Sequence, residues 1–239
     1  MAGWLMMELP QTEDLSLSPQ LSPTHLVVFG RPGSGKTSLA EQLGEDEGYV
    51  LIRTGEMLRA AVRRRDSLGA RVEQYVTSGK LVPDDVIFEL LEQSLKEPGT
   101  ARLLFDGFPR TLGQVTLLEQ FEQKLNFTID GFLEIAISRA EAIARMIGRR
   151  VCPVCGTPYH IVRKPPKIAE TCDHDGARLV SRPDDALDVV EVRQTFYDEH
   201  AAPVVEHYRV HAPDRFFRVN GEQSFDAVYA ETRRVLGFS

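Results

Sequence analysis

A glycine-rich turn near the start of this chain constrains its fold more than any other stretch. Four residues suited to a β-strand, residues 26–29, lead directly into the run Gly-Arg-Pro-Gly-Ser-Gly-Lys-Thr-Ser of residues 30–38. Residues 30–37 match the pattern G-x-x-x-x-G-K-[ST], in which a strand ends in a phosphate-binding loop and a helix follows. The helix-like residues 38–43 supply the second half of that context. The sequence therefore predicts a strand, a loop and a helix that together bind phosphate groups.

The residue types in this loop explain how it holds phosphate. Glycines let successive backbone N–H groups converge on phosphate oxygens, and the N-terminus of a helix adds the positive end of its dipole. We expect Lys36 to reach the terminal phosphates, and the hydroxyl of Thr37 or of Ser38 to help hold Mg²⁺. The sequence leaves open which of the two hydroxyls faces the metal.

Length and net charge narrow the function classes. The chain has 239 residues, 42% of them hydrophobic, which predicts one domain with insertions. The net charge of -7 argues against general nucleic-acid binding, so arginines that bind phosphate must gather locally. No apolar run has the length of a transmembrane helix. Residues 1–24 contain no Lys or Arg but three acidic residues, which excludes an ordinary signal or transit peptide and predicts a flexible extension.

All three cysteines fall within a short segment in the second half of the chain. An odd number does not suit a closed disulfide framework, so we expect free thiols in a reducing compartment and a cytoplasmic protein. Cys152-x-x-Cys155 and Cys172-x-x-Asp175, separated by sixteen residues, have the spacing of two knuckles of a tetrahedral zinc site. His174 competes with Asp175 because imidazole is the commoner ligand, but its offset is one residue short of the knuckle spacing. Three unligated thiols remain the alternative.

Strands alternate with helices along the rest of the chain. We expect strands at 26–29, 49–52, 102–106, 132–137 and 215–219. We expect helices at 55–65, 68–78, 84–96, 140–147, 184–207 and 224–236, and one that ends near Leu125. This alternation predicts a parallel sheet with helices on both faces and ligands beyond the carboxyl ends of the strands, where Gly30 and Asp106 lie.

Five further motifs carry a family resemblance. Three are Arg53-Thr-Gly-Glu-Met-Leu-Arg59, Phe105-Asp-Gly-Phe-Pro-Arg110-Thr and Arg145-Met-Ile-Gly-Arg149-Arg150, and two are Gly79-Lys-Leu-Val82 and Ser181-Arg182-Pro-Asp-Asp185. With the glycine-rich loop, they resemble adenylate kinases of the nucleoside monophosphate kinase family, over about residues 25–236. The cysteine segment is similar to the zinc-bearing lid of the long bacterial form.

The resemblance implies a fold and a division of the chain. It implies a P-loop NTPase-type α/β fold, with a five-stranded parallel sheet covered by helices on both faces. After an extension at 1–24, the kinase domain comprises a core (25–52, 82–148 and 183–239), an NMP-binding helical insertion (53–81) and a small zinc-binding lid (149–182). Closure of that lid, a family property, would bring cations to the phosphates and exclude water.

The resemblance also implies an activity: reversible, Mg²⁺-dependent transfer of the γ-phosphoryl group of ATP to AMP, which gives two ADP and serves adenine nucleotide homeostasis. A loose phosphoryl-transfer transition state needs positioning and positive charge, which planar arginines supply well. It implies a monomer that binds ATP, AMP and ADP, with no nucleic-acid or membrane partner. The implied catalytic residues are Lys36, Asp106, Arg110, Arg149, Arg182 and Arg193.

Two nucleotide sites follow from the same resemblance. The ATP site would comprise Gly33, Ser34, Gly35, Lys36, Thr37, Ser38, Arg145, Arg149, Pro158, Tyr159 and Gln223. The AMP site would comprise Thr54, Gly55, Arg59, Lys80, Leu81, Val82, Gly107, Phe108, Pro109, Arg110, Gln114, Arg182 and Arg193. Gln114 offers amide donors and an acceptor to an adenine edge, and Val82 would pack on the base.

The sequence leaves the roles of some residues open. By resemblance, Asp106 holds Mg²⁺ through water, whereas Asp184 and Asp185 either orient lid arginines or cap the helix that they open. The sequence departs from the family pattern in two places. Thr37-Ser38 stands where the family has Gly-Thr, so that a hydroxyl replaces the small residue after Lys36, and Gln223 stands where the family often has a lysine near the ATP base. Three rival functions remain: a kinase for UMP or CMP, a nucleotide sensor without turnover, and a zinc-dependent nucleic-acid binder. Thr111 and Gln114 favour AMP over the pyrimidine acceptors.

Overall fold

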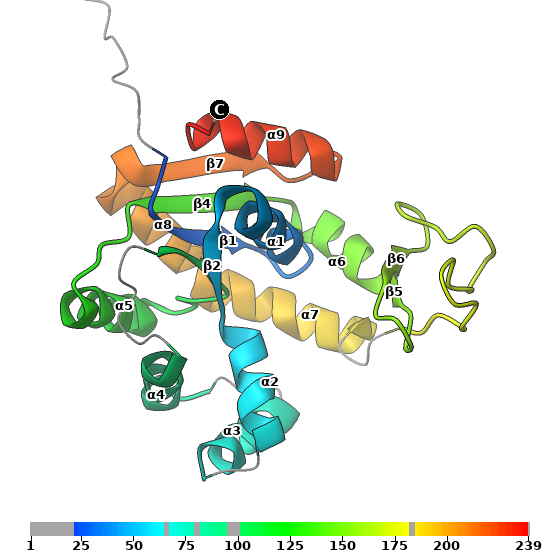
Figure 1. Ribbon diagram of the computed structural model, residues 1–239, viewed down its shortest axis with the longest axis horizontal. Helices are drawn as coiled ribbons and strands as arrows, with labels where there is room; N and C mark the ends of the chain where they lie inside the picture. Colours follow the sequence, from blue (N-terminus) through cyan, green and yellow to red (C-terminus); the bar gives the residue numbers. More distant parts are fainter. Residues whose placement is uncertain (1–21, 65–66, 79–81, 95–100, 182–184, 239) are drawn as a thin grey trace, which may run out of the picture.

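Five parallel strands form the central sheet of this protein. The computed structural model describes residues 22–64, 67–78, 82–94, 101–181 and 185–238. The strands lie in the order β2-β3-β1-β4-β7, which confirms the predicted fold class (Figure 1). Their bounds are β1 (His25–Gly30), β2 (Tyr49–Arg53), β3 (Arg102–Asp106), β4 (Gly131–Ala136) and β7 (Phe216–Asn220).

The register brings the chemistry-bearing ends of the strands together. Val28 of β1 pairs with Asp106 at the end of β3, and Gly30 at the end of β1 pairs with Ile135 of β4. The loop that follows Gly30 and the loop that follows Asp106 therefore leave the same edge of the sheet. This edge carries the sites of parallel α/β sheets.

Helices cover both faces of the sheet because β1 is buried on both sides. Leu26 and Val28 pack in one apolar cluster with α1 (Lys36–Glu47) and α9 (Phe225–Val235). Val27 and Phe29 pack in another with α4 (Asp84–Ser94), α5 (Leu112–Leu125) and α8 (Ala202–His211). A continuous apolar run is the pattern of a central parallel strand, and it fixes β1 in the middle of the sheet.

Two smaller units extend from this core. Helices α2 (Thr54–Arg64) and α3 (Ser67–Ser78) follow β2 and project from one side of the core (Figure 1). The second unit follows α6 (Arg139–Ile147) and contains an antiparallel pair, β5 (Arg149–Val151) and β6 (Pro158–His160), which the sequence did not predict. It leads into α7 (Leu187–Phe196). The predicted domain bounds stay predictions, although these units fall where the two insertions were expected.

The long helix predicted over residues 184–207 is interrupted in the structure. The described helical run begins at Leu187, and a π-helical segment, Tyr197–Ala201, separates α7 from α8, which continues to His211. Pro203 explains the interruption, because it has no backbone N–H and its ring conflicts with the carbonyl four residues earlier. The N–H of Ala202 instead bonds to the carbonyl of Tyr197. Asp184 lies outside the described residues.

The chain joins the core slightly before the predicted boundary at residue 24. The buried Pro23 accepts a hydrogen bond through its carbonyl from Arg102 Nη2 at 2.8 Å, and the backbone N–H of Thr24 donates to Asp130 at 2.9 Å. Residues 1–21 lie outside the described part. Among the helices of the described part, none combines the length and the apolar character that crossing a membrane requires.

We expect the centre of the sheet to be intolerant of truncation. Leu133 of β4 is fully buried, at 0% exposure, so Leu133→Ala should lower the free energy of unfolding by about 2–5 kcal/mol through lost burial and a cavity. Leu187→Ala makes the same chemical change at a side chain that is 57% exposed, and it should cost less than about 1 kcal/mol. Denaturant unfolding measures both values, and equal losses would contradict this account of the core.

Candidate functional site

The loop between β1 and α1 forms the floor of the site. The backbone N–H of Ser34 donates to the carbonyl of Arg31 at 3.0 Å, and Lys36 Nζ donates to the same carbonyl at 3.2 Å. Gly33 has a φ of +92°, and a Cβ there would lie 2.8 Å from the carbonyl of Ala142 in α6. The strand, loop and helix predicted from the sequence are therefore confirmed, and glycine is required where the loop touches α6.

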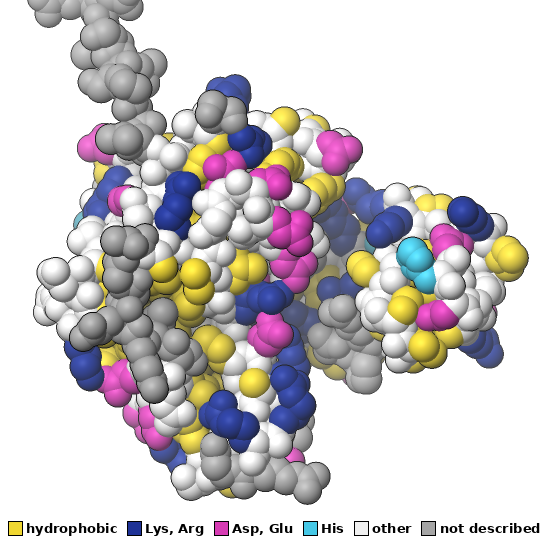
Figure 2. Space-filling model, in the orientation of Figure 1, with side chains coloured by type: hydrophobic (Ala, Val, Ile, Leu, Met, Phe, Trp, Pro, Cys, Tyr) yellow, Lys and Arg dark blue, Asp and Glu magenta, His cyan; other side chains and the backbone are white. Residues whose placement is uncertain are grey.

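Lys36 lies among several charged side chains. Burial is the largest influence on its pKa, which falls to about 8, and the positive charges of Arg110, Arg193 and Arg149 lower it further. Asp106 acts in the opposite direction. These influences show that side chains from separate parts of the sequence converge on one position. Figure 2 shows Lys and Arg side chains gathered on the side of the core that faces the lid unit.

Arg110 belongs to the same group of charges. Burial lowers the pKa of its guanidinium, Asp106 raises it, and Arg193 and Arg59 lower it. Four of the other expected phosphate-binding cations thus act on the pKa of Lys36 or of Arg110, and they are Arg59, Arg110, Arg149 and Arg193. The sixth, Arg182, lies outside the described residues.

Asp106 lies beside one of the two candidate hydroxyls. Thr37 Oγ1 donates to Asp106 Oδ2 at 2.7 Å, and the carboxylate is buried at the end of β3. Thr37 and Ser38 are both exposed, so the contact with Asp106 is what distinguishes the two hydroxyls. A hydroxyl and a carboxylate in contact are the oxygen donors that Mg²⁺ prefers. The residues present therefore fit a Mg²⁺ ion at this edge of the sheet.

The turn after β3 connects the core with the first helical insertion. Gly107 has a φ of +86°, and a Cβ there would lie 2.7 Å from Arg110 Nη2. The carbonyl of Gly107 accepts from Arg110 Nε at 2.6 Å and from Thr54 Oγ1 at 2.9 Å. Phe108 is buried and precedes a cis bond to Pro109. Thr54, at the start of α2, and Arg110 are therefore held against the same turn.

Gln114 is buried beside this turn. Its residue is only 2% exposed, its Oε1 accepts from the backbone N–H of Arg110 at 2.8 Å, and its Nε2 donates to Asp84 Oδ1 at 3.0 Å. Val82, the expected partner of a base, is also buried. Lys80 and Leu81 lie outside the described residues. Asp84 was not predicted as a site residue, because nothing in the sequence relates it to a glutamine thirty residues later.

A second group of contacts surrounds Arg145 of α6. Its Nη2 donates to the carbonyl of Gly221 at 2.7 Å, and its Nε pairs with Glu141 at 2.5 Å. Its Nη1 lies 3.4 Å from the carbonyl of Ser34, in the phosphate-binding loop. Gln223 donates to Glu231 at 2.8 Å. Arg145 thus joins the loop to the segment between β7 and α9.

Tyr159 was expected near the ATP base, and its side chain lies inside the lid unit. Its ring is buried in the lid unit, its hydroxyl lies 3.5 Å from Cys172 Sγ, and it accepts from the N–H of Asp173 at 2.8 Å. The side chain therefore belongs to the interior of the lid, and only its main chain is left to meet a nucleotide. Pro158, which precedes it in β6, is exposed.

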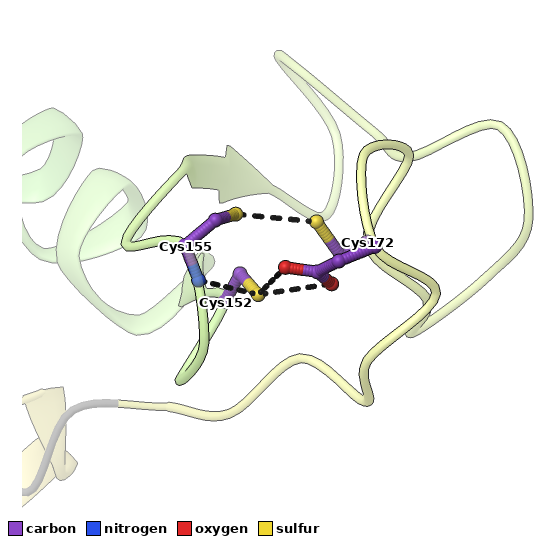
Figure 3. A group of neighbouring side chains, drawn as sticks. Cys152, Cys155 and Cys172 are labelled. Atoms are coloured by element: carbon purple, nitrogen blue, oxygen red, sulfur yellow. Dashed lines mark hydrogen bonds between the residues drawn. The ribbon is translucent and has the colours of Figure 1, made fainter.

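The four expected metal ligands of the lid lie together. Their ligand atoms are within 4.8 Å of one another, and the residues are Cys152, Cys155, Cys172 and Asp175. Figure 3 shows that the first two come from one loop and that Cys172 comes from a second loop facing it. Backbone N–H groups of Cys155 and His174 approach the sulfurs of Cys152 and Cys172 at 3.4 Å. Three thiols and a carboxylate in this arrangement form a candidate metal site.

An ion pair joins the lid to α7. Arg149, at the start of β5, donates from Nε to Asp185 Oδ2 at 2.8 Å and from Nη2 to Oδ1. The Asp185 side chain is 1% exposed, and the residue that caps α7 is Ala186. Of the two roles considered for Asp185, the geometry fits the contact with an arginine.

Two residues under the loop were not predicted as functional. Gln194 of α7 is fully buried and donates from Nε2 to the carbonyl of Pro32 at 3.0 Å. Arg31 pairs with Asp198 at 2.5 Å, and its guanidinium lies 4.7 Å from the centre of the Tyr197 ring. The loop therefore rests on α7 and on the π-helical segment. The loop pattern leaves residue 31 unspecified, so it carried no signal for this contact.

Comparisons with known proteins agree with this geometry. The family model described as "Adenylate kinase" matches residues 28–212. Adenylate kinases of Carboxydothermus hydrogenoformans and Bacillus subtilis are 35% and 36% identical to this chain over 212 and 214 residues. These alignments cover 88% and 89% of this chain, and 98% of each relative. An adenylate kinase of Pyrococcus abyssi is 33% identical over 214 residues, covering 90% of this chain and 96% of the relative.

The match extends from β1 through α8, and it includes the phosphate-binding loop and the lid with its cysteine cluster. Members of this family bind adenine nucleotides and use Mg-ATP. The chain belongs to the adenylate kinase family, and it transfers a phosphoryl group between ATP and AMP.

Proposed function

We propose that the group of cations around Lys36 carries the reversible transfer of the γ-phosphoryl group from ATP to AMP, which gives two ADP. The convergence of the charges of Arg110, Arg149 and Arg193 on Lys36 is the observation that supports this assignment. Two nucleotides bring many negative charges together, and the loose transition state spreads charge over the equatorial phosphoryl oxygens. Fixed cations stabilise that charge without reorganising at the moment of reaction.

Each cation has a distinct place in this mechanism. Lys36 leaves its contact with the carbonyl of Arg31 and binds the terminal phosphates of ATP, while backbone N–H groups of residues 33–38 hold the remaining phosphates. Arg110, fixed by Gly107, binds the phosphate of AMP together with Arg59. Arg149 and Arg193 bind the transferred phosphoryl group, and Arg182 would join them. Arg149 and Arg182 would contact this group from the lid, and Arg193 from α7.

Thr37 and Asp106 fit the Mg²⁺ ion that accompanies ATP. Their oxygens lie 2.7 Å apart, so we assign the metal-facing hydroxyl to Thr37 rather than to Ser38. When bound, Mg²⁺ neutralises charge on the phosphates and orients them. Asp106 is held at the end of β3, where its carboxylate faces both the hydroxyl and Lys36.

The two bases bind on opposite sides of the phosphates. Arg145, together with the main chain at Pro158, Tyr159 and Gln223, covers the adenine of ATP. The AMP site consists of Thr54, Gly55, Arg59, Val82, Gly107, Phe108, Pro109, Arg110 and Gln114, with Lys80, Leu81, Arg182 and Arg193. The side-chain amide of Gln114 hydrogen-bonds to the edge of the adenine, and Val82 packs against the adenine ring.

The cluster in the lid fits a structural zinc ion. Cys152, Cys155, Cys172 and Asp175 would complete a tetrahedral set, which leaves no open position for substrate. Few apolar residues are buried inside the lid, and its cluster consists of Cys152, Tyr159, Cys172 and Leu179, with Ala177 packed on it. A metal therefore supplies the cross-links that so small a core lacks. A monomer in the cytoplasm, where thiols stay reduced, remains our prediction.

We expect the cations to act on rate rather than on folding. Lys36→Ala and Arg110→Ala should each lower kcat for ADP formation by about 10³-fold or more, because charge on the transferred group loses a fixed partner. Arg209→Ala removes an exposed arginine that pairs with Glu206 on α8, and it should keep the normal rate. A coupled assay with ATP and AMP, with thermal unfolding as a check of folding, measures these effects. A full rate in either site variant would refute the mechanism.

The lowered pKa of Lys36 predicts a pH dependence. The ammonium group binds phosphate only when charged, so kcat/KM for ATP should fall as the pH rises through about 8. Bound phosphates favour the charged form, so the decline in kcat should begin at higher pH than the decline in kcat/KM. Lys36→Ala should show a lower kcat/KM without this inflection. A wild-type profile that is flat from about pH 7 to 9 would show that Lys36 does not titrate there.

The lid metal should stabilise the protein without selecting the acceptor. Chelation should lower the melting temperature and leave the preference for AMP unchanged, because the predicted ligands lie outside the phosphate site. Asp175→Ala should reduce zinc content, whereas His174→Ala, its neighbour outside the cluster, should keep it. Elemental analysis of protein purified without chelators measures the metal. Protein without zinc would remove this proposal, and equal losses in both variants would remove the assignment to Asp175.

A further inference from the structure

The side-chain amide of Gln114 lies between two groups of opposite hydrogen-bonding character. Its Oε1 accepts from the backbone N–H of Arg110 at 2.8 Å, and its Nε2 donates to Asp84 Oδ1 at 3.0 Å. A backbone N–H can only donate, and a carboxylate can only accept. The two partners are therefore satisfied by one orientation of the amide. The reversed orientation would set the carbonyl oxygen against the carboxylate and the NH₂ group against the N–H.

The burial of Gln114 makes this orientation hard to reverse. The residue is 2% exposed, so water does not replace a partner that the amide loses on turning. The bond to Asp84 involves a charged acceptor and is the stronger kind. Thr111 Oγ1 accepts from the backbone N–H of Gln114 at 3.2 Å, which holds the residue in the first turn of α5.

The amide keeps one acceptor site and one donor site beyond these two bonds. Oxygen in an amide has two lone pairs and nitrogen has two hydrogens, and the contacts with the described residues occupy one of each. A base that meets this edge must therefore offer a donor to Oε1 and an acceptor to Nε2. Adenine offers that pair through its 6-amino group and N1. Hypoxanthine, of nearly the same size, offers the reverse through its 6-oxo group and its protonated N1.

We propose that Asp84 is a specificity-determining residue: by fixing the orientation of the Gln114 amide, it makes the acceptor site select 6-amino purine monophosphates over 6-oxo purine monophosphates. Asp84 is a positioning residue, because it acts on the base through Gln114. This inference rests on the proposed role of Gln114 at the acceptor base. It predicts that the site discriminates against IMP, which differs from AMP only at the 6-position and N1.

The position of Asp84 is well suited to this role. It is the first residue of α4, directly after Pro83, and it meets the NH₂ end of the Gln114 amide, whereas the turn that carries Arg110 meets the oxygen end. A Cβ at residue 113 would lie 3.1 Å from Asp84 Oδ2. The glycine at that position leaves room for the carboxylate to lie against α5.

Acceptor discrimination tests the proposal directly. The measured quantity is the ratio of kcat/KM for AMP to kcat/KM for IMP, with ATP as donor, and IMP inhibition against AMP gives a second reading. Asp84→Asn keeps the shape of the side chain, but its amide can also donate, so it accommodates either orientation of Gln114. The AMP-to-IMP ratio should fall by about tenfold or more, since a charge-assisted bond no longer opposes the reversed amide.

Asp85→Asn is the matched control. Asp85 is the next residue of α4 and is exposed, and it pairs with Arg71 on the surface. The same loss of charge there should leave the ratio unchanged. Asp84→Asn with wild-type selectivity, or with AMP and IMP activity lowered equally, would overturn the proposal, because a merely structural role affects both acceptors alike.

Two further variants separate the possible failures. Gly113→Ala places a methyl group against the Asp84 carboxylate, so it should also lower the AMP-to-IMP ratio of kcat/KM. This variant replaces Asp84→Asn in the test if Asp84→Asn does not fold. Gln114→Ala should raise the KM for AMP and abolish most of the discrimination. If Gln114→Ala changes neither quantity, the assignment of Gln114 to the acceptor base fails. If it changes both while Asp84→Asn and Gly113→Ala resemble Asp85→Asn, only the role of Asp84 fails.

Discussion

Repulsion among the cations above the phosphate-binding loop is the constraint on which the rest of the structure depends. The positive charges of Arg110, Arg193 and Arg149 lower the pKa of Lys36, Arg193 also lowers the pKa of Arg110, and Asp106 raises both pKa values. Cations that repel one another do not bring one another together. Each member is therefore supplied by a separate element: α1, the turn after β3, β5 and α7. Polyphosphate relieves the repulsion, so binding favours the arrangement in which all of them face inward.

Contacts with α7 and with the π-helical segment hold the phosphate-binding loop in place despite this repulsion. Gln194 of α7 donates to the carbonyl of Pro32, and Arg31 reaches the π-helical segment, where it pairs with Asp198 and lies over Tyr197. Arg139 of α6 also pairs with Asp198, at 2.7 Å. The helix that carries Arg193 is thus bonded to the loop that carries Lys36. The irregular segment that Pro203 imposes on the helix supplies both partners of Arg31.

The sequence predicted the parts of the structure that rest on local patterns. The apolar run before Gly30, the glycines, and the Cys-x-x-Cys spacing each specify a strand, a loop or a ligand set within a few residues, and the structure contains all three. Contacts between distant residues were not predicted. The Tyr159 hydroxyl lies 3.5 Å from Cys172 Sγ, and Asp84 meets Gln114 across two helices. The π-helical segment within the predicted long helix was not predicted either.

The contact between Asp84 and Gln114 shows why an adenylate kinase needs more than its cations to choose a substrate. The arginines bind phosphate oxygens, which every nucleoside monophosphate carries, so charge alone does not distinguish one base from another. A neutral amide reads a base only if its donor and acceptor ends are fixed, because a freely turning amide fits either pattern. Fixing it requires partners that cannot exchange roles, and a carboxylate and a backbone N–H meet that requirement. Selectivity for the base therefore depends on buried hydrogen bonds behind Gln114, while the rate depends on the positive charge concentrated around Lys36.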